Sequence, residues 1–250
     1  KITEIVIPAS VETIGFGAFM NGGEVLRAFT VAGGNKEFKS VDGVLYSKDG
    51  KTLLSYPSGK EDESFTVSDG VKTIGDCAFF ACKALESITL PDGLKKIGVS
   101  AFNSCKALES ITLPDGLKEI GDSAFEGCNA LESITLPASV TKVGEYALSC
   151  ESLKQVRYEG TTDEWEEVEQ GKRWLCETQV KKVRCSDGFG VLSENAFGDD
   201  DEDEEDEDEE PDINDSEDDE IDTNDSEDDE IDTNDSEDWD EEEEEGDEAD

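Results

Sequence analysis

The chain has 250 residues and a formal net charge of −46, and most of that charge lies at one end. Residues 199–250 hold 37 of the 67 acidic residues and no Lys or Arg, which leaves 30 acidic against 21 basic residues in 1–198. No basic stripe is visible in the sequence, which argues against nucleic acid as a partner, and no apolar run is long enough to cross a membrane as a helix.

A diverged repeat occupies residues 1–23 and returns further along the chain. It reads IVIPASVETIGFGAFMNG from Ile5, and residues 65–155 carry four closer copies. Copies 88–110 (ITLPDGLKKIGVSAFNSCKALES) and 111–133 (ITLPDGLKEIGDSAFEGCNALES) match almost residue for residue and set a period of 23. A fixed period in the twenties predicts a solenoid, because one unit cannot bury its own apolar face and stacked units share a core.

Residues 24–64 interrupt the repeats and are predicted to form an inserted β-hairpin segment. Stretches 43–47 and 51–56 alternate in polarity around Lys48-Asp49-Gly50, a three-residue loop with Gly at its end. We therefore expect the first repeat to be separated from the four stacked repeats at 65–155 by this hairpin.

Each unit of 65–155 is predicted to hold a short strand, a turn and one helical turn. In 108–113 the pattern Leu-x-x-Ile-x-Leu buries alternate side chains, and Pro114-Asp115-Gly116 supplies the turn. Asp122 or Ser123 is expected to cap the helical turn. With units about 4.8 Å apart, like residues should stack in rows, one of Ile88, Ile111, Ile134 and Val156 and another of Phe19, Phe79, Phe102, Phe125 and Leu148.

Residues 156–198 are predicted to cap the end of the solenoid. Thr161 and Glu164 have the spacing of a capping box, and Trp165 falls in the first helical turn that follows. A solenoid needs an end that covers its core, so we interpret Trp165 and Trp174 as parts of this cap, in preference to an aromatic ligand pocket.

The seven cysteines give no firm indication of a redox compartment. Cys82, Cys105 and Cys128 recur at the repeat period, and Cys150 follows after a one-residue deletion. A straight row does not suit tetrahedral zinc, and the spacing between units is too wide for disulfides, so we interpret these cysteines as small core residues. The spacing leaves open whether Cys176 and Cys185 pair in an exported protein.

The composition argues against catalysis. The chain contains no His, which removes Ser-His-Asp and Cys-His catalysis and every zinc site that uses imidazole. The glycines follow the repeat and form no phosphate-binding loop. Nothing singles out a catalytic carboxylate pair among the many acidic residues, so the sequence predicts a protein that is not an enzyme and needs no cofactor.

The outward positions of the predicted strands form the candidate binding site. A regular, nearly uncharged hydroxyl surface is expected from Ser87, Thr89, Ser110, Thr112, Ser133 and Thr135, with Arg157 at its end. Solenoids bind partners on such extended faces, so these residues are predicted to contact a protein or another macromolecule. The alternative is that Ser and Thr occur there only because they suit exposed strand positions.

Residues 199–250 are predicted to form a disordered acidic tail, because they carry one sign of charge and few apolar residues. The first interpretation is a solvating extension, and attraction to a basic partner is an alternative. The other alternative is weak, diffuse Ca²⁺ binding without an EF-hand loop, at Asp215, Glu217, Asp218, Asp225, Glu227 and Asp228.

The repeat L-x-x-I-x-L-P-x-x-V-x-x-I-G-x-x-A-F-x-x-C, matched five times, resembles the BspA-like leucine-rich-repeat family of bacterial surface proteins. Residues 35–60 resemble the inserted hairpin of that family, and 158–165 with 183–188 resemble its closing segment. The resemblance implies a leucine-rich-repeat solenoid, mainly β with short helical turns. It also implies an extracellular or cell-surface location, although the chain shows no signal peptide.

Together these observations predict a bacterial surface or secreted repeat protein, monomeric in the favoured interpretation. It is expected to mediate adhesion or macromolecular recognition through its strand face, without inserting into a membrane. The first alternative is a low-affinity Ca²⁺-binding or mineral-associated protein that acts through the tail. An enzyme is the second alternative.

Overall fold

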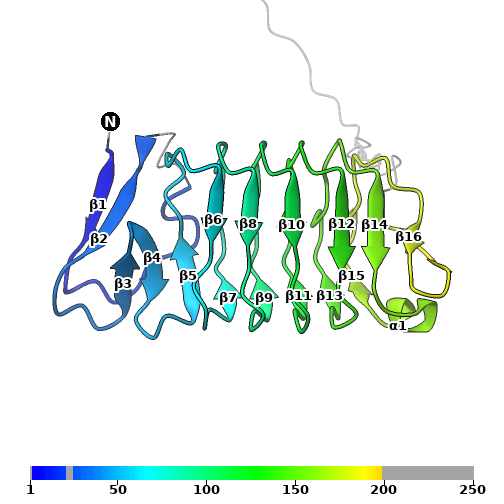
Figure 1. The fold of residues 1–250 in the computed structure, drawn as a ribbon, viewed down its shortest axis with the longest axis horizontal. Coiled ribbons are helices and arrows are strands. Elements are labelled where there is room, and N and C mark those ends of the chain that lie inside the picture. Colours follow the sequence, from blue (N-terminus) through cyan, green and yellow to red (C-terminus); the bar gives the residue numbers. More distant parts are fainter. Residues whose placement is uncertain (1, 21–24, 199–250) are drawn as a thin grey trace, which may run out of the picture. The chain divides into compact units, whose positions relative to one another are not determined.

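The computed structural model describes residues 2–20 and 25–198, which fall within one compact unit, 1–202. The chain forms stacked turns of parallel β-strands with very little helix, as Figure 1 shows. The predicted leucine-rich-repeat solenoid is therefore confirmed. The expectations for the acidic tail, including the six Ca²⁺ candidates, lie outside the described residues.

The four stacked repeats each contribute strands to two sides of the solenoid. One side carries β6 (Ser64–Thr66), β8 (Ser87–Thr89), β10 (Ser110–Thr112), β12 (Ser133–Leu136), β14 (Gln155–Tyr158), β16 (Val183–Arg184) and β17 (Phe189–Gly190), and β1 (Glu4–Ile7) and β2 (Ala28–Val31) form a separate two-stranded sheet. The other side is one eight-stranded sheet of β3 (Phe38–Val41), β4 (Val44–Ser47), β5 (Thr52–Ser55), β7 (Thr73–Ile74), β9 (Lys96–Ile97), β11 (Glu119–Ile120), β13 (Lys142–Val143) and β15 (Glu169–Gln170). We call β6, β8, β10, β12, β14 and β16 the strand face, and the eight-stranded side the second sheet.

The third side of each unit turns without forming the expected helix. Ser100, Ser123 and Tyr146, at equivalent positions, have φ of 52°, 53° and 53°, a left-handed conformation that does not start an α-helix. The amides that follow alternate: Phe125 N donates to Ala147 O of the next unit at 2.9 Å, whereas Glu126 N donates to Ser123 O of its own unit at 3.2 Å. The only α-helix in the described part of the chain is α1 (Thr162–Glu166).

The prediction that Asp122 caps a helical turn in its own unit is also wrong. Asp122 Oδ1 accepts a hydrogen bond from the backbone N–H of Glu145 in the next unit, at 2.9 Å. Asp76 makes the equivalent bond to Val99 N at 2.9 Å. These carboxylates therefore join neighbouring units and cap no helix.

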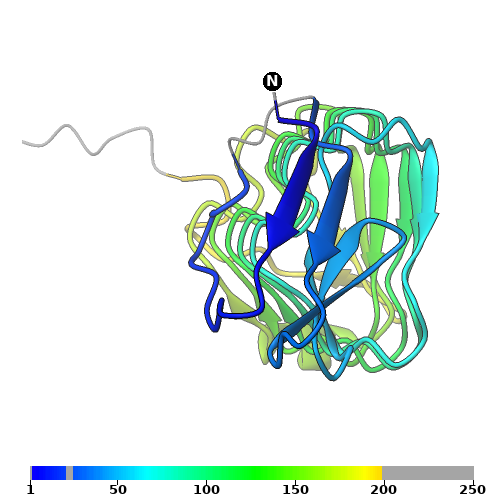
Figure 2. The same cartoon turned by 90° about the vertical axis from the view of Figure 1, so that its left-hand side faces the viewer.

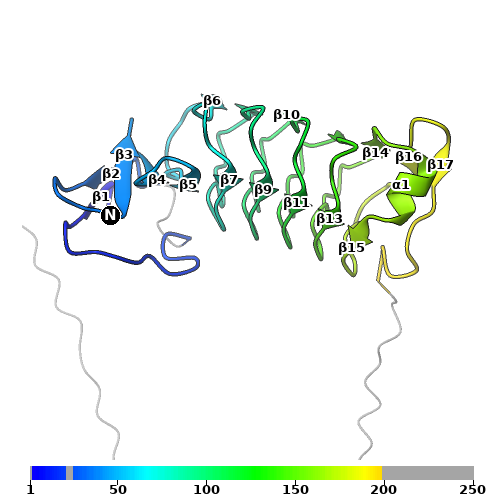
Figure 3. The ribbon, with the colours of Figure 1, turned by 90° about the horizontal axis from the view of Figure 1, so that it is seen from below.

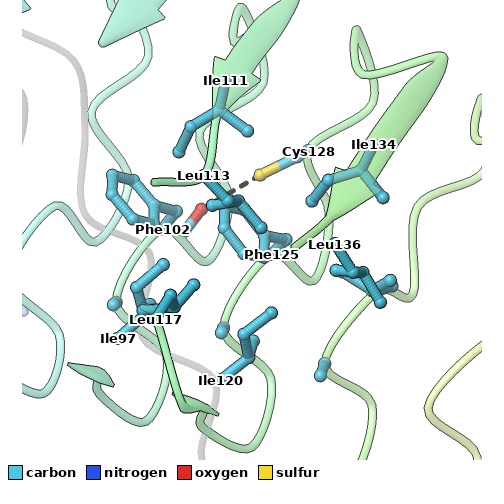
Figure 4. Close-up of a cluster of buried hydrophobic side chains, with 14 of the residues drawn as sticks. Ile97, Phe102, Ile111, Leu113, Leu117, Ile120, Phe125, Cys128, Ile134 and Leu136 are labelled. Atoms are coloured by element: carbon cyan, nitrogen blue, oxygen red, sulfur yellow. Dashed lines mark hydrogen bonds between the residues drawn. The ribbon is translucent and has the colours of Figure 1, made fainter. Parts of the chain in front are cut away.

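The core is a set of aligned rows, drawn in Figure 4. Phe79 and Phe102 stack with ring centroids 5.0 Å apart and planes at 11°, and Phe102 and Phe125 with 5.2 Å and 5°. The strand registers pair Ile111 with Ile88 and Ile134 with Val156, as the repeat predicts. Burying these side chains stabilises the stack by roughly 1.5–3 kcal/mol each.

The insertion divides the core in two. The predicted hairpin is present as β4 and β5, and β3, which pairs antiparallel with β4, adds a strand that the sequence analysis missed. On β4, Val44 and Tyr46 pack into the core of the stacked repeats, whereas Leu45 packs against the first unit. In Figure 2 this end, with β1 and β2, faces the viewer.

Because the insertion intervenes, Phe19 does not continue the phenylalanine row. It packs edge-on against Phe29, with centroids 4.7 Å apart. Tyr56 takes the place next to Phe79, at 5.2 Å. The expectation of one row that includes Phe19 is therefore wrong.

The far end is covered by α1, β16 and β17 (Figure 3). The predicted capping box is present: Thr161 Oγ1 accepts from Glu164 N, and the Glu164 carboxylate accepts from Thr161 N at 2.8 Å. Trp165 is fully buried, contacts Tyr158 and Trp174, and donates its indole N–H to Val191 O at 2.9 Å. The two tryptophans thus close the apolar end of the stack.

Candidate functional site

The predicted binding residues lie together on the strand face, in parallel rows one strand apart. Thr89 pairs in register with Thr66 and Thr112, and Thr135 pairs with Arg157. Between these two groups, β10 and β12 lie side by side although they belong to separately hydrogen-bonded sheets. Figure 1 shows the strands of the face in sequence along the stack.

The outward direction of these side chains agrees with the alternation expected of a strand. Thr89, Ser110, Thr112, Ser133, Thr135 and Arg157 are exposed, and Ser87 is half-buried. Ile88, Ile111 and Ile134 between them are buried. The structure thus brings all seven candidate residues to one surface; whether they bind a partner stays a prediction.

A second outward row borders the hydroxyls. Glu63, Glu86, Glu109 and Glu132 precede the serines on successive strands and are all exposed. Backbone bonds keep three of them in line, with Glu86 N donating to Glu63 O at 2.7 Å and Glu109 N to Glu86 O at 3.0 Å. We call these four residues the glutamate row.

The chemistry of the face changes abruptly between β12 and β14. Lys154, whose backbone N–H donates to Glu132 O at 2.9 Å, follows the glutamate row. Arg157 and Arg184 follow the threonines, and they pair in register on β14 and β16. Lys181 and Lys182, which directly precede β16, complete what we call the cationic cluster: Lys154, Arg157, Lys181, Lys182 and Arg184, all exposed.

The cationic cluster was not predicted from the sequence, in which no basic stripe is visible. Its members come from residues 154–157 and 181–184, two short stretches that are far apart in the sequence and that do not by themselves indicate a cluster. Register places Arg184 beside Arg157, a separation of 27 residues that the 23-residue period does not predict. The separation departs from the period because the cap lengthens this turn of the solenoid with α1.

An exposed aromatic ring borders the cluster. Phe189 on β17 pairs in register with Arg184, and its side chain is 60% exposed. Lys182 Nζ lies 5.0 Å from the centroid of that ring, within the range of a cation–π contact. The end of the strand face therefore combines positive charge with an apolar surface.

The cysteine row is a structural feature of the interior. Cys82, Cys105, Cys128 and Cys150 are buried, and all seven cysteines of the chain, Cys176 and Cys185 included, are free thiols. Burial raises the pKa of Cys82, and for Cys128 the contact with Cys150 together with burial raises the pKa. Thiols held in the protonated form are poor nucleophiles.

Within residues 2–20 and 25–198, no group of three or more His, Cys, Asp or Glu side chains could hold a metal ion. A hollow of about 190 Å³ beside Phe19 contains one carboxylate, that of Asp76. A second, of about 160 Å³, contains Asp49 and Asp69, but Asp49 is engaged by Ser47 and by Lys51 N in the hairpin turn.

No helix in the described residues is both long and apolar enough to cross a membrane. The repeats, the two-sided stack and the buried rows define the class of protein, a leucine-rich-repeat solenoid. Residues 58–169 match the model of the BspA type leucine rich repeat region, in six copies. The sequence of this region is similar to the BspA-type leucine-rich-repeat family, as the repeat pattern indicates.

Solved structures of bacterial proteins share the fold. The pneumococcal vaccine antigen PcpA is similar with a TM-score of 0.66 and 29% identity, over 79% of this chain and 48% of that one. A leucine-rich repeat protein from Eubacterium ventriosum gives 0.63 and 30%, over 73% and 48%. A leucine rich cell surface protein from Faecalibacterium prausnitzii gives 0.52 and 33%, over 67% and 51%.

The chain therefore spans about half the length of these three proteins. A search of curated proteins gave no significant match. These comparisons show the fold, the family match covers residues 58–169, and the partner is left open.

Proposed function

We propose that this protein is a bacterial surface or secreted recognition protein that binds another macromolecule, a protein in the first instance, through its strand face. The observation that carries the proposal is the outward row on neighbouring strands, formed by one register-paired group of Thr66, Thr89 and Thr112 and a second of Thr135, Arg157 and Arg184. Leucine-rich-repeat solenoids use extended faces of this kind for protein interaction. Similarity to a protein described as a cell surface protein supports the location.

The face suits binding better than catalysis. Its side chains stand on rigid strands whose inner residues are buried, so little conformational freedom is lost when a partner docks. Hydroxyl groups donate and accept hydrogen bonds without the desolvation cost of a charge. A catalytic role would need converging reactive groups in a cleft, and the hollows beside Phe19 and Tyr46 offer none.

The first experiment measures binding of the full chain to extracellular-matrix and cell-surface preparations, with Thr89, Thr112 and Thr135 each changed to Lys. Three long charged side chains along one row should obstruct a docked partner and weaken binding at least tenfold, about 1.4 kcal/mol. The circular dichroism spectrum and the thermal midpoint should stay unchanged, because all three positions are exposed.

The matched control is Thr141→Lys. Thr141 is exposed and precedes β13 on the second sheet, so the same chemical change is made on the opposite side of the solenoid. Binding should be unaffected. If the triple variant binds as well as the unmodified chain, or if Thr141→Lys weakens binding equally, the strand face is the wrong site.

A further inference from the structure

The strand face has two charge zones, and their order constrains what binds there. The glutamate row runs along β6, β8, β10 and β12, and the cationic cluster begins at the next strand, β14. Lys154 Nζ joins Glu132 at 2.6 Å, so the boundary between the zones is itself an ion pair. A surface of either sign alone would attract any oppositely charged polymer; this one presents both signs in sequence.

The two arginines at the positive end are held together by the fold. Adjacent parallel strands place Arg157 beside Arg184 at about 4.8 Å between backbones. Within residues 2–20 and 25–198, the structure records an ion pair for neither of them. Like charges on neighbouring strands repel each other, and a carboxylate from a partner would relieve the repulsion.

Guanidinium groups favour carboxylates in particular. The planar fork of Arg donates two parallel hydrogen bonds to a carboxylate, and such charge-assisted bonds are about twice as strong as neutral ones. Lys182 and the exposed ring of Phe189 lie next to this pair and add charge and apolar contact. The positive end is therefore suited to an acidic side chain with hydrocarbon around it.

The negative zone decides between classes of partner. A nucleic acid or an anionic glycan long enough to lie along the face would pass over Glu63, Glu86 and Glu109, where its charges are repelled. A polypeptide can carry both signs. It can place carboxylates over β14 and β16 and Lys or Arg along the glutamate row.

We infer that the strand face binds a polypeptide segment of a partner protein in one polarity, with its acidic part anchored by Arg157 and Arg184 and its basic part along the glutamate row. This inference rests on the proposed function, because it assigns partner chemistry to the same face. It adds two anchoring residues and the order of charges that the partner must present.

The test uses the full chain and a fluorescent synthetic peptide with a Glu block and a Lys block joined by Ser and Gly. Binding is followed by fluorescence anisotropy at two salt concentrations. Changing both Arg157 and Arg184 to Gln should weaken binding by about tenfold or more, since each substitution removes a charged hydrogen-bond donor. Every protein compared retains residues 199–250, so any effect of that acidic segment on the probe is common to all.

The matched control removes two positive charges from the second sheet. Lys95 and Lys118 are exposed, precede β9 and β11, and lie in line because Lys118 N donates to Lys95 O at 2.9 Å. The double change of Lys95 and Lys118 to Gln alters net charge as the arginine variant does and should change affinity less than twofold. An equal loss in both variants would show attraction to net charge only and would overturn the inference.

Three further outcomes separate this inference from the proposed function. If heparin or a uniform polyglutamate peptide binds more tightly than the two-block peptide, the face binds a simple polyanion, and the inference is overturned. If the Thr89, Thr112 and Thr135 variant loses surface binding and the arginine variant does not, the strand face is still the binding site, but the inferred order of charges is overturned. If neither variant affects binding, the proposed function fails as well.

Discussion

Cys105, Cys128 and Cys150 each donate a thiol hydrogen bond to a phenylalanine carbonyl of the preceding unit. The Sγ–O distances are 3.0, 3.2 and 3.0 Å, to Phe79, Phe102 and Phe125. Each of these carbonyls also accepts a backbone N–H of its own unit, so the thiol adds a second hydrogen bond as well as filling a small space, which the repeat pattern alone did not reveal. Figure 4 shows one of these bonds between Cys128 and Phe102.

This environment predicts how stability depends on pH. The pKa of Cys82 and that of Cys128 are raised above the ordinary value of 9.0, so the folded chain keeps protons that the unfolded chain releases. Their contribution is complete below pH 9.0 and is lost as pH rises beyond it. We expect a lower free energy of unfolding in urea at about pH 10 than at about pH 8.

The Cys128→Ala variant provides the control for that measurement. It should lose stability at both pH values through the missing side chain and should show a smaller fall between them, because one titrating group is gone. In thiol labelling of the native protein, half-buried Cys176 should react before the four cysteines of the row. A free energy of unfolding that rises between the two pH values would contradict the assignment.

At the scale of the structural element, a glycine in each unit allows the backbones to stack closely. A Cβ on Gly121 would lie 2.6 Å from the carbonyl carbon of Gly98 and 2.7 Å from the nitrogen of Val99. Gly98 meets the preceding unit in the same way. A glycine is therefore needed at this position because the backbone of the preceding unit leaves no room for a Cβ, in addition to permitting a turn.

Gly121→Ala should lower the free energy of unfolding by at least about 2 kcal/mol, because backbone atoms must move apart to admit the methyl group. Gly15→Ala is the matched control: Gly15 holds the same position in the first unit, and a Cβ there would meet nothing within 4 Å. Its effect should stay within about 0.5 kcal/mol. Equal effects of the two substitutions in urea unfolding would disprove the steric explanation.

Across the whole of the described region, the C-terminal cap closes the stack through Trp165. This residue is fully buried between Tyr158 and Trp174, and Gly190 packs so closely that a Cβ there would collide with the indole. Without the indole, the last repeats would expose their rows to water, and terminal units determine the solubility of a solenoid.

Trp165→Ala should therefore destabilise the protein by roughly 3–5 kcal/mol, the usual cost of a large aromatic cavity. Val191→Ala, at a position that is 68% exposed next to the same strand, should have little effect. Both are measured by urea unfolding, with size-exclusion chromatography to detect self-association of the uncapped stack. Unchanged stability of the Trp165 variant would mean that the solenoid does not depend on this cap.

Much of the fold could be predicted because a repeat turns local pattern into three-dimensional position. Residues one period apart become neighbours, so the rows of Ile111 and of Phe125 followed directly from the sequence. The hydroxyl row was predicted in the same way. The prediction failed where the period breaks: at Phe19, which the insertion separates from Phe79, and at Arg184, which the cap brings beside Arg157.

The sequence by itself determined the solenoid, the capping box and the seven residues of the candidate surface, since each depends on spacing within or between copies of one unit. Only the tertiary structure decided three features: the left-handed turn in place of a helix, the hydrogen bonds that Asp122 accepts and Cys128 donates between units, and the cationic cluster at the end of the strand face. These features depend on which backbone groups and side chains meet between units. Strand register decides these contacts between units. Inside the repeats the period predicts the register, whereas at the cap the register depends on the length of an irregular connection.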